Sequence, residues 1–176
     1  ANIQPHFFYA STCHVYKSSD TPLKESDPVE PINNYGMTKY IAEVLLEYHA
    51  NRIQIPLCIG RIFSFYHHTQ KVPFLYPNIL RRFAEENLDN PFPLRGALSV
   101  RDLSNAELIC DRIIKLVLKN AEGVFNIGSG KGTTIQGFVQ SLAPRPLTFD
   151  IDKNEKIHYL VADISKLKSE IALDDL

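Results

Sequence analysis

A strand–helix–strand pattern near the start of the chain constrains the fold more than any other feature. Residues 7–10 form a short apolar and aromatic run, and residues 55–62 form a second one. Such runs are typical of buried strands. Residues 33–51 carry apolar side chains at helical spacing, and we expect a helix, capped by Asn33 or Asn34, whose core face is formed by Ile41, Val44, Leu45 and Tyr48. Two strands joined by one helix should pair in parallel through a right-handed crossover.

The rest of the chain alternates between helices and strands. Helices are expected at residues 78–86, at 104–119 after a Ser104 cap, and through residue 142 after a cap at Thr133 or Thr134. The core face of the second of these helices is expected to be formed by Ile109, Ile113, Ile114 and Val117. Strands are expected at residues 123–127, 146–149 and 157–161, and Asp163 is a candidate cap for a last short helix. This alternation predicts the α/β fold class.

Composition and charge argue against several classes of function. The chain has 176 residues and a formal net charge of −1, so no basic surface favours nucleic acid. No apolar run is long enough to cross a bilayer, and no signal peptide opens the sequence, although its first residue need not be the natural start. Three widely spaced cysteines form no CxxC pair, which suits a reducing compartment. We therefore expect a cytoplasmic protein that binds no nucleic acid, membrane or metal.

Tyr35 and Lys39 lie four residues apart in the first predicted helix and therefore share one of its faces. Chance also produces this spacing, and taken alone an exposed pair without function is the simpler interpretation. A tyrosine hydroxyl with the ordinary pKa of about 10 is no base at neutral pH, but an ammonium one turn away stabilises the phenolate. The pair could then exchange a proton with an alcohol or a ketone. Thr12, at the end of the preceding strand, can hydrogen-bond the same substrate oxygen.

The order of these segments resembles the extended short-chain dehydrogenase/reductase family, in particular its NAD-dependent nucleotide-sugar epimerases, dehydratases and ketoreductases. The matching segments are Ser11-Thr12-Cys13-His14-Val15-Tyr16, a polar loop that reaches Pro31, and Tyr35-Gly36-Met37-Thr38-Lys39. The resemblance implies that Thr12 orients the substrate hydroxyl, that Tyr35 exchanges the proton, and that Lys39 supports Tyr35 and holds the nicotinamide ribose. It also implies a site for NAD or NADP lined by Ala10, Ser11, Ile62, Tyr35 and Lys39.

Later segments extend the resemblance over nearly the whole chain. Arg61-Ile62-Phe63-Ser64-Phe65-Tyr66 is similar to the family's Arg-x-x-Asn-x-Tyr-Gly-Pro segment, with Ser64 in place of Asn and His67-His68 in place of Gly-Pro. Arg101-Asp102 resembles the segment whose arginine binds the diphosphate, and residues 123–130 and 161–167 match two more. Ser64 and Arg101 are therefore expected to bind a nucleotide-sugar substrate.

The resemblance also implies how the chain is divided. Residues 1–62 are expected to form the later part of a Rossmann-like, doubly wound parallel sheet. Residues 63–176 are expected to form mainly a smaller, mostly helical substrate lobe, from which some segments return to the sheet.

Two departures from the family pattern limit what the chain can do. The sequence contains no Gly-x-x-Gly-x-x-Gly turn, which in this family places the cofactor's pyrophosphate on a helix N-terminus. Cys13 and His14 stand where the family's dehydratases carry Asp and Glu, which argues against dehydration. His14 either acts as an acid/base or lines the substrate pocket. We expect an epimerase or 4-ketoreductase without its cofactor-binding half; the alternative is a non-catalytic remnant or binding module of the same fold.

A sheet without its first strands exposes an edge. We expect this edge to pair with a partner or with a missing N-terminal segment. The family resemblance separately implies a homodimer whose contact includes the helix of Tyr35 and Lys39, with Tyr40, Glu43 and Glu47 exposed for it. Residues 128–133 look like a phosphate loop but lack its Gly-Lys-Ser/Thr order, so a tight turn into a helix explains them. His67-His68 has no HxxxH or CxxC partner and is interpreted as a polar loop.

Overall fold

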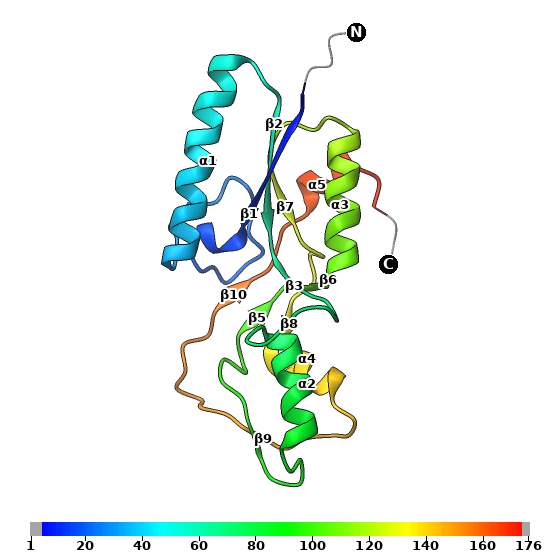
Figure 1. The fold of residues 1–176 in the computed structure, drawn as a ribbon. Coiled ribbons are helices and arrows are strands. Elements are labelled where there is room, and N and C mark those ends of the chain that lie inside the picture. The colour runs from blue at the N-terminus through cyan, green and yellow to red at the C-terminus, as the bar shows by residue number, and fades with distance from the viewer. Residues whose placement is uncertain (1–4, 174–176) are drawn as a thin grey trace.

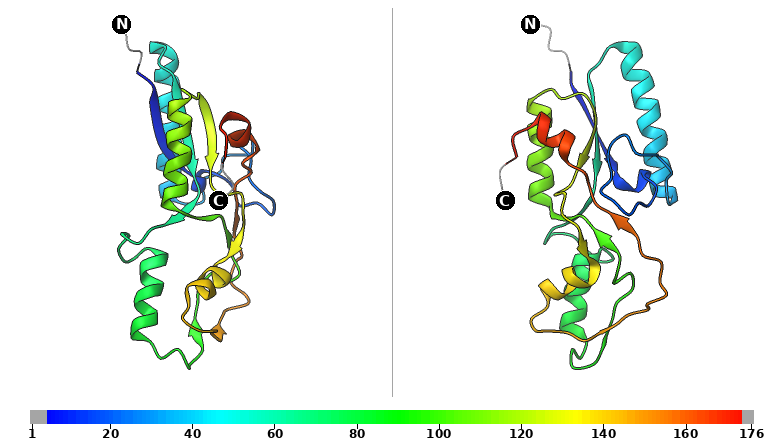
Figure 2. Two further views of the ribbon diagram at one scale, coloured as in Figure 1. Left: turned by 90° about the vertical axis from the view of Figure 1, so that its right-hand side faces the viewer. Right: turned by 180° about the vertical axis from the view of Figure 1, so that it is seen from behind.

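A three-stranded parallel sheet forms the upper half of the molecule in the computed structural model, which describes residues 5–173 (Figure 1). Its strands are β1 (Phe7–Thr12), β2 (Leu57–Ile62) and β7 (Gly123–Ile127), in the order β1-β2-β7. The pairing of β1 with β2 runs from Phe7 opposite Leu57 to Thr12 opposite Ile62, and it is parallel as predicted. Helices α1 (Asn34–Ile53) and α3 (Ala106–Leu118) lie on one side of the sheet, and α5 (Ser165–Glu170) lies on the other (Figures 1 and 2).

Within residues 5–173, β1 is an edge strand, because it pairs with β2 only. Its first residue, Phe7, is 48% exposed, and Ala10 is exposed as well. The expectation of a buried strand at residues 7–10 is therefore wrong for Phe7 and Ala10 and only partly met at Phe8 and Tyr9, whereas β2 is buried along nearly its whole length, as predicted. The reason is that β2 has a strand on each side and β1 does not.

Helix α1 begins and ends close to the predicted limits, but its buried face is not the predicted one. The Asn33 side chain caps it by accepting a hydrogen bond from the Gly36 amide at 2.8 Å. The side that meets the sheet is formed by Gly36, Glu43 and the partly buried Tyr40. The predicted core residues all remain exposed, namely Ile41, Val44, Leu45 and Tyr48. Helical periodicity identifies an apolar stripe but not the surface that covers it.

Residues 63–122 leave the sheet and return to it. β3 (Ser64–Tyr66) pairs in parallel with β6 (Leu103–Asn105), and between them lie α2 (Leu75–Glu85), β4 (Phe92–Pro93) and β5 (Val100–Arg101). Helix α3 follows β6 and is capped by Asn105, not by Ser104, which belongs to β6. On α3 the structure buries Ile109 and Leu116 but leaves Ile114 and Val117 exposed, so half of its predicted core face is wrong.

The lower half of the molecule has its own hydrophobic cluster (Figure 1). After β7 the chain forms β8 (Thr133–Thr134), α4 (Ile135–Leu142), β9 (Phe149–Asp150) and β10 (Tyr159–Leu160). Thr134 caps α4, as expected. The two predicted strands before α5 exist but are only two residues long. They pair with β4 and β5, and β5 also pairs antiparallel with β8. At the last helix Ile164 is the cap residue, although the Asp163 carboxylate still accepts a hydrogen bond from the Ser165 amide at 2.8 Å.

Across the described residues, no helix has both the length and the apolar character that crossing a membrane requires.

Candidate active site

One cavity of about 540 Å³ lies where β1 and β2 end and the lower half of the molecule begins. Parallel α/β sheets bind ligands beyond the carboxyl ends of their strands. All nine residues that the sequence singles out for catalysis, cofactor or substrate line this cavity, namely Ala10, Ser11, Thr12, His14, Tyr35, Lys39, Ile62, Ser64 and Arg101. The structure therefore brings together residues that are spread over more than ninety positions of the chain.

Thr12 and His14 are placed by the turn that ends β1. Residues Cys13–Val15 form the 3-10 helix η1, and Thr12 caps it by accepting a hydrogen bond from the His14 amide at 3.3 Å. Because this contact uses the hydroxyl oxygen of Thr12 as an acceptor, its hydrogen stays free to be donated to a bound group. Thr12 is only 5% exposed, so its orientation is well defined.

Tyr35 and Lys39 project from the first turns of α1 toward the same cavity. The Lys39 Nζ lies 5.9 Å from the centre of the Tyr35 ring and donates a hydrogen bond to the Ala10 carbonyl at 2.9 Å. This bond fastens the ammonium to the end of β1. The Tyr35 ring is 54% exposed and meets the His14 ring edge-on, with the ring centres 6.1 Å apart. The pair is thus an accessible phenol beside a fixed positive charge.

Gly36 makes this approach of α1 to η1 possible. A Cβ at this position would lie 2.2 Å from the carbonyl oxygen of His14, which is backbone and cannot rotate away. Only glycine therefore lets the helix carry Tyr35 against the end of β1.

His14 and Arg101 both line the cavity, and the charge of Arg101 acts on His14. Burial, and then the Arg101 charge, lower the pKa of His14 below 6.5, so its imidazole is neutral at neutral pH. The His14 Nδ1 is buried and has no hydrogen-bond partner within the described chain. Burial also lowers the pKa of Arg101, which donates to the His158 carbonyl at 3.4 Å and forms no ion pair with a carboxylate of residues 5–173. A guanidinium in such a position can accept an anionic ligand.

Cys13, by contrast, takes no visible part in chemistry. It is fully buried, and burial raises the pKa of its thiol to about 12. A thiol with such a pKa stays protonated at neutral pH and is a poor nucleophile.

A buried ion pair joins α1 to β2 near the cavity, and the sequence gives no sign of it. Arg61 on β2 meets Glu43 on α1 at 2.8 Å, and both side chains are almost completely buried. The Ser11 hydroxyl also donates to Glu43, so that α1, β1 and β2 are tied together directly behind Thr12. Burial alone would lower the pKa of Arg61, but its hydrogen bonds to Glu43 raise it above the ordinary value. The expectation that Glu43 is exposed for a dimer contact is therefore wrong, because its buried carboxylate pairs with Arg61.

Asp102 explains the loop that looks like a phosphate site. Its fully buried carboxylate accepts hydrogen bonds from the backbone amides of Ser129 and Gly130 at 2.8 and 2.7 Å. The Ser129 hydroxyl donates to it at 2.6 Å. The loop thus binds an anionic group, but this group is the Asp102 carboxylate and not a bound phosphate. Its neighbour Arg101 lines the cavity.

Aromatic side chains line the part of the cavity that faces the lower half of the molecule, and the sequence analysis did not assign them. They are Phe65, Tyr66, Phe74, Tyr76 and Phe138. Phe65 and Tyr66 directly follow Ser64, so their sequence position next to a predicted substrate residue could have predicted that they line the cavity. Tyr76 and Phe138 come from α2 and α4, and only the fold brings them here.

Comparisons with known proteins agree with this arrangement. A UDP-glucose 4-epimerase from Rhizobium leguminosarum bv. trifolii is 29% identical, over 92% of this chain and 57% of the relative. A dTDP-4-dehydro-6-deoxyglucose reductase from Escherichia coli is 28% identical, over 77% of this chain and 43% of the relative. The structure of UDP-glucuronic acid 4-epimerase from Bacillus cereus, in complex with UDP-glucuronic acid and NAD, shares the fold with a TM-score of 0.80 and 24% identity, over 97% of this chain and 56% of that one.

The chain therefore spans about half the length of the relatives that it matches. The family model described as GDP-mannose 4,6 dehydratase matches residues 2–172, and its description does not by itself assign the reaction of a member. Because this match runs over nearly the whole sequence and its relatives share the fold, the chain belongs to the NAD-dependent epimerase/dehydratase family of extended short-chain dehydrogenases/reductases.

Proposed function

We propose that this chain is the active-site and substrate-binding part of an NAD(P)-dependent nucleotide-sugar epimerase or 4-ketoreductase. One observation carries the proposal: nine residues assigned from sequence to catalysis, cofactor and substrate line the same cavity. A non-catalytic module of this fold has no physical need to keep a phenol, an ammonium and a threonine hydroxyl around one empty space.

Proton transfer is assigned to Tyr35. In the direction of oxidation, the phenolate of Tyr35 takes the proton of the sugar hydroxyl; in reduction, the phenol returns it to the ketone oxygen. The Lys39 ammonium, held by the Ala10 carbonyl, stabilises the phenolate. The free hydrogen of the Thr12 hydroxyl is donated to the same substrate oxygen and fixes its position.

The described residues fit the nicotinamide-ribose end of a dinucleotide. Lys39 and the carboxyl end of β1 form one wall of the cavity, and Ala10 is exposed there. Lys39 would hold the ribose hydroxyls, and Ser11 and Ile62 would flank the ring. When bound, the nicotinamide supplies hydride transfer. The Gly-rich loop of residues 128–130 offers the pyrophosphate no cradle, because Asp102 already occupies its amides.

The substrate is proposed to be a nucleotide sugar. Arg101, which forms no ion pair with a carboxylate within residues 5–173, would hold its diphosphate, and Ser64 would contact the sugar; both residues line the cavity, which supports this assignment. The neutral imidazole of His14 can serve as a second acid/base, which an epimerase or reductase can use. Dehydration is not proposed, because Cys13 is buried and His14 is no carboxylate.

Two surfaces favour a contact with further polypeptide. The apolar stripe of α1 is exposed, and β1 has an unpaired edge within the described chain. Another copy of the chain could cover the apolar stripe of α1, and a preceding segment could pair with the free edge of β1.

The experiment is a fluorescence titration of NADH and NADPH against this chain and against a polypeptide extended upstream. Binding by the extended polypeptide alone supports the proposal, whereas absence of binding by both would refute it. In parallel, calorimetry with UDP, dTDP and GDP tests the diphosphate site without any cofactor. Arg101→Met should weaken that binding, and Arg145→Met, which alters an exposed arginine, should not.

A further inference from the structure

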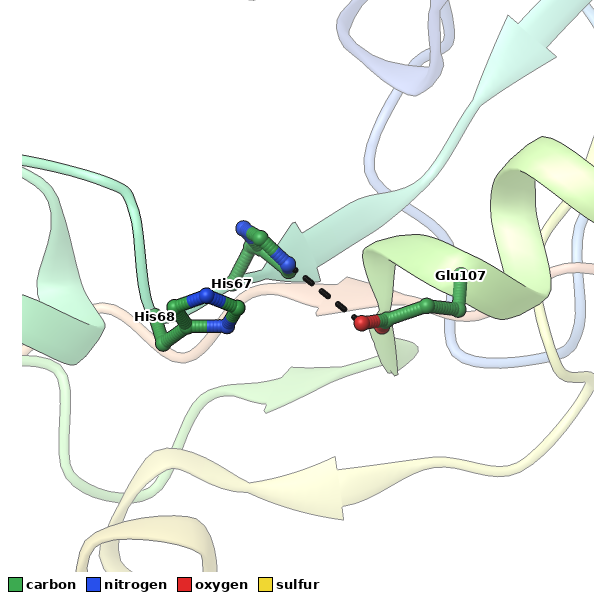
Figure 3. A group of neighbouring side chains, drawn as sticks. All are labelled: His67, His68 and Glu107. Carbon is green, nitrogen blue, oxygen red and sulfur yellow. Dashed lines mark ion pairs between the residues drawn. The ribbon is translucent and has the colours of Figure 1, made fainter.

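Two histidines and a glutamate from distant parts of the chain meet outside the cavity described above. His67 and His68 follow β3, and Glu107 lies in the first turn of α3, forty residues later (Figure 3). One ligand atom from each side chain lies within 4.8 Å of the others. The sequence places the two histidines beside each other but gives no sign of Glu107. The fold therefore supplies the third ligand whose absence argued against a metal.

The separation of the ligand atoms agrees with tetrahedral zinc coordination. Nitrogen and oxygen ligands lie about 2.0–2.2 Å from zinc, so two of them in a tetrahedral site are separated by about 3.4 Å. The His67 Nε2 lies 3.3 Å from the Glu107 Oε1. The rings of His67 and His68 are in contact, with their centres 3.9 Å apart, so His68 needs only a small side-chain rotation to reach the same point.

Local hydrogen bonds hold the cluster in place. The hydroxyl of Thr69 lies 2.7 Å from the His67 Nδ1, and the Thr69 amide donates to the same nitrogen at 3.3 Å, so that the Nε2 of the ring is directed toward Glu107. Metal binding through Nε2 requires the Nδ1 to carry the proton instead and to donate it to the Thr69 hydroxyl. The Gln70 side chain accepts from the His67 amide at 3.2 Å, and Asn105 caps α3 by accepting from the Glu107 amide at 3.2 Å. Metal-binding histidines are typically oriented in this way through their second ring nitrogen.

We propose that His67, His68 and Glu107 bind a divalent transition-metal ion of the zinc class. Two imidazoles and one carboxylate make a donor set that suits zinc, with a fourth position open to water. The ion ties the segment after β3 to α3. That segment also supplies Gln70 to the wall of the cavity, and it directly follows Phe65 and Tyr66 of β3, which line the same wall. The metal therefore fixes one side of the substrate-facing cavity without entering it.

The test is calorimetric titration of Zn²⁺ into the purified protein, with Co²⁺ absorption as an independent report of tetrahedral coordination. Exposed Cys110 lies one turn beyond Glu107 on α3 and could bind zinc by itself, so every variant carries Cys110→Ser. One ion per chain is expected. His67→Ala and Glu107→Gln should each weaken binding by about tenfold or more, because removing a ligand costs at least as much as removing its support.

Controls come from exposed side chains of the same type elsewhere in the chain. His49→Ala and Glu122→Gln should leave the affinity unchanged. His68→Ala should remove the tetrahedral Co²⁺ spectrum, and a spectrum that His68→Ala leaves unchanged would overturn the three-ligand site. Absence of stoichiometric binding, or an unchanged affinity in His67→Ala or Glu107→Gln, would overturn the proposal. Neither result depends on whether the protein binds a nucleotide.

Discussion

Replacing Gly36 with alanine tests how tightly α1 is packed against the end of β1. A Cβ there would lie 2.2 Å from the His14 carbonyl oxygen and 2.7 Å from its carbon, so the backbones must separate by roughly 0.8 Å to bring the first contact to 3.0 Å. Overpacking of this kind costs about 1–3 kcal/mol. Alanine inside a helix returns about 0.5–1 kcal/mol. The free energy of unfolding should therefore fall by up to about 2.5 kcal/mol in urea denaturation.

The chain contains a matched control on α4. Gly137 is also the third helical residue, and its amide likewise donates to the cap side chain, here Thr134 at 3.0 Å. A Cβ at Gly137 would meet the Thr134 hydroxyl at 3.0 Å and the Thr133 methyl group at 3.7 Å, and both are side-chain atoms. Gly137→Ala should thus be neutral or slightly stabilising. Equal stabilities of Gly36→Ala and Gly137→Ala would refute the close approach of α1. In a complete enzyme, a displacement of Tyr35 by nearly 1 Å should also lower turnover by up to about 100-fold.

Three further predictions concern buried groups near the cavity. Glu43→Ala leaves the Arg61 charge buried and unpaired, and it should lower the free energy of unfolding by about 3–5 kcal/mol. Adding Arg61→Met removes the unpaired charge and should restore part of this loss. A loss below about 1 kcal/mol in Glu43→Ala would contradict the buried pair. In the folded protein, a thiol reagent should modify exposed Cys110 quickly and leave Cys13 unreacted until unfolding, since burial raises the pKa of Cys13 to about 12. Because burial lowers the pKa of His14 below 6.5, the unfolded chain takes up this proton more readily, and stability should fall as the pH drops below about 6.5. His14→Gln should make that fall shallower, and an unchanged slope would show that His14 titrates normally.

Local features of the site are predictable from sequence. The cap at Asn33, the strand at β2 and the four-residue spacing of Tyr35 and Lys39 all depend on neighbours within a few positions. The end of β1 at Thr12 is predictable as a ligand edge, because parallel α/β sheets bind ligands beyond the carboxyl ends of their strands. That Tyr35 and Arg101 meet there follows from the family resemblance and not from strand geometry, because Arg101 lies in a separate small sheet.

Long-range partners are not predictable in the same way. Glu43 looks like a solvent-facing residue of α1, and only the packing of α1 on β2 shows that it pairs with Arg61. The carboxylate of Asp102 is separated by more than twenty residues from the loop that holds it. The apolar stripe of α1 has the periodicity of a core face, yet within residues 5–173 nothing covers it. An amphipathic pattern shows which face of a helix is apolar, but it does not show which other element packs against that face.

The most direct test of the account is the turnover of a Tyr35→Phe variant of the polypeptide that includes the upstream segment. Nucleotide sugars carrying UDP, dTDP or GDP would be assayed with NAD and NADP by the absorbance of the reduced nicotinamide and by epimer analysis. Tyr48→Phe is the matched control, because Tyr48 lies on the same helix and is 55% exposed against 54% for Tyr35. The account predicts that Tyr35→Phe loses at least about 100-fold in kcat while still binding cofactor, and that Tyr48→Phe keeps full activity. Turnover by Tyr35→Phe that equals the unmodified protein would contradict the assignment of the proton transfer to this cavity.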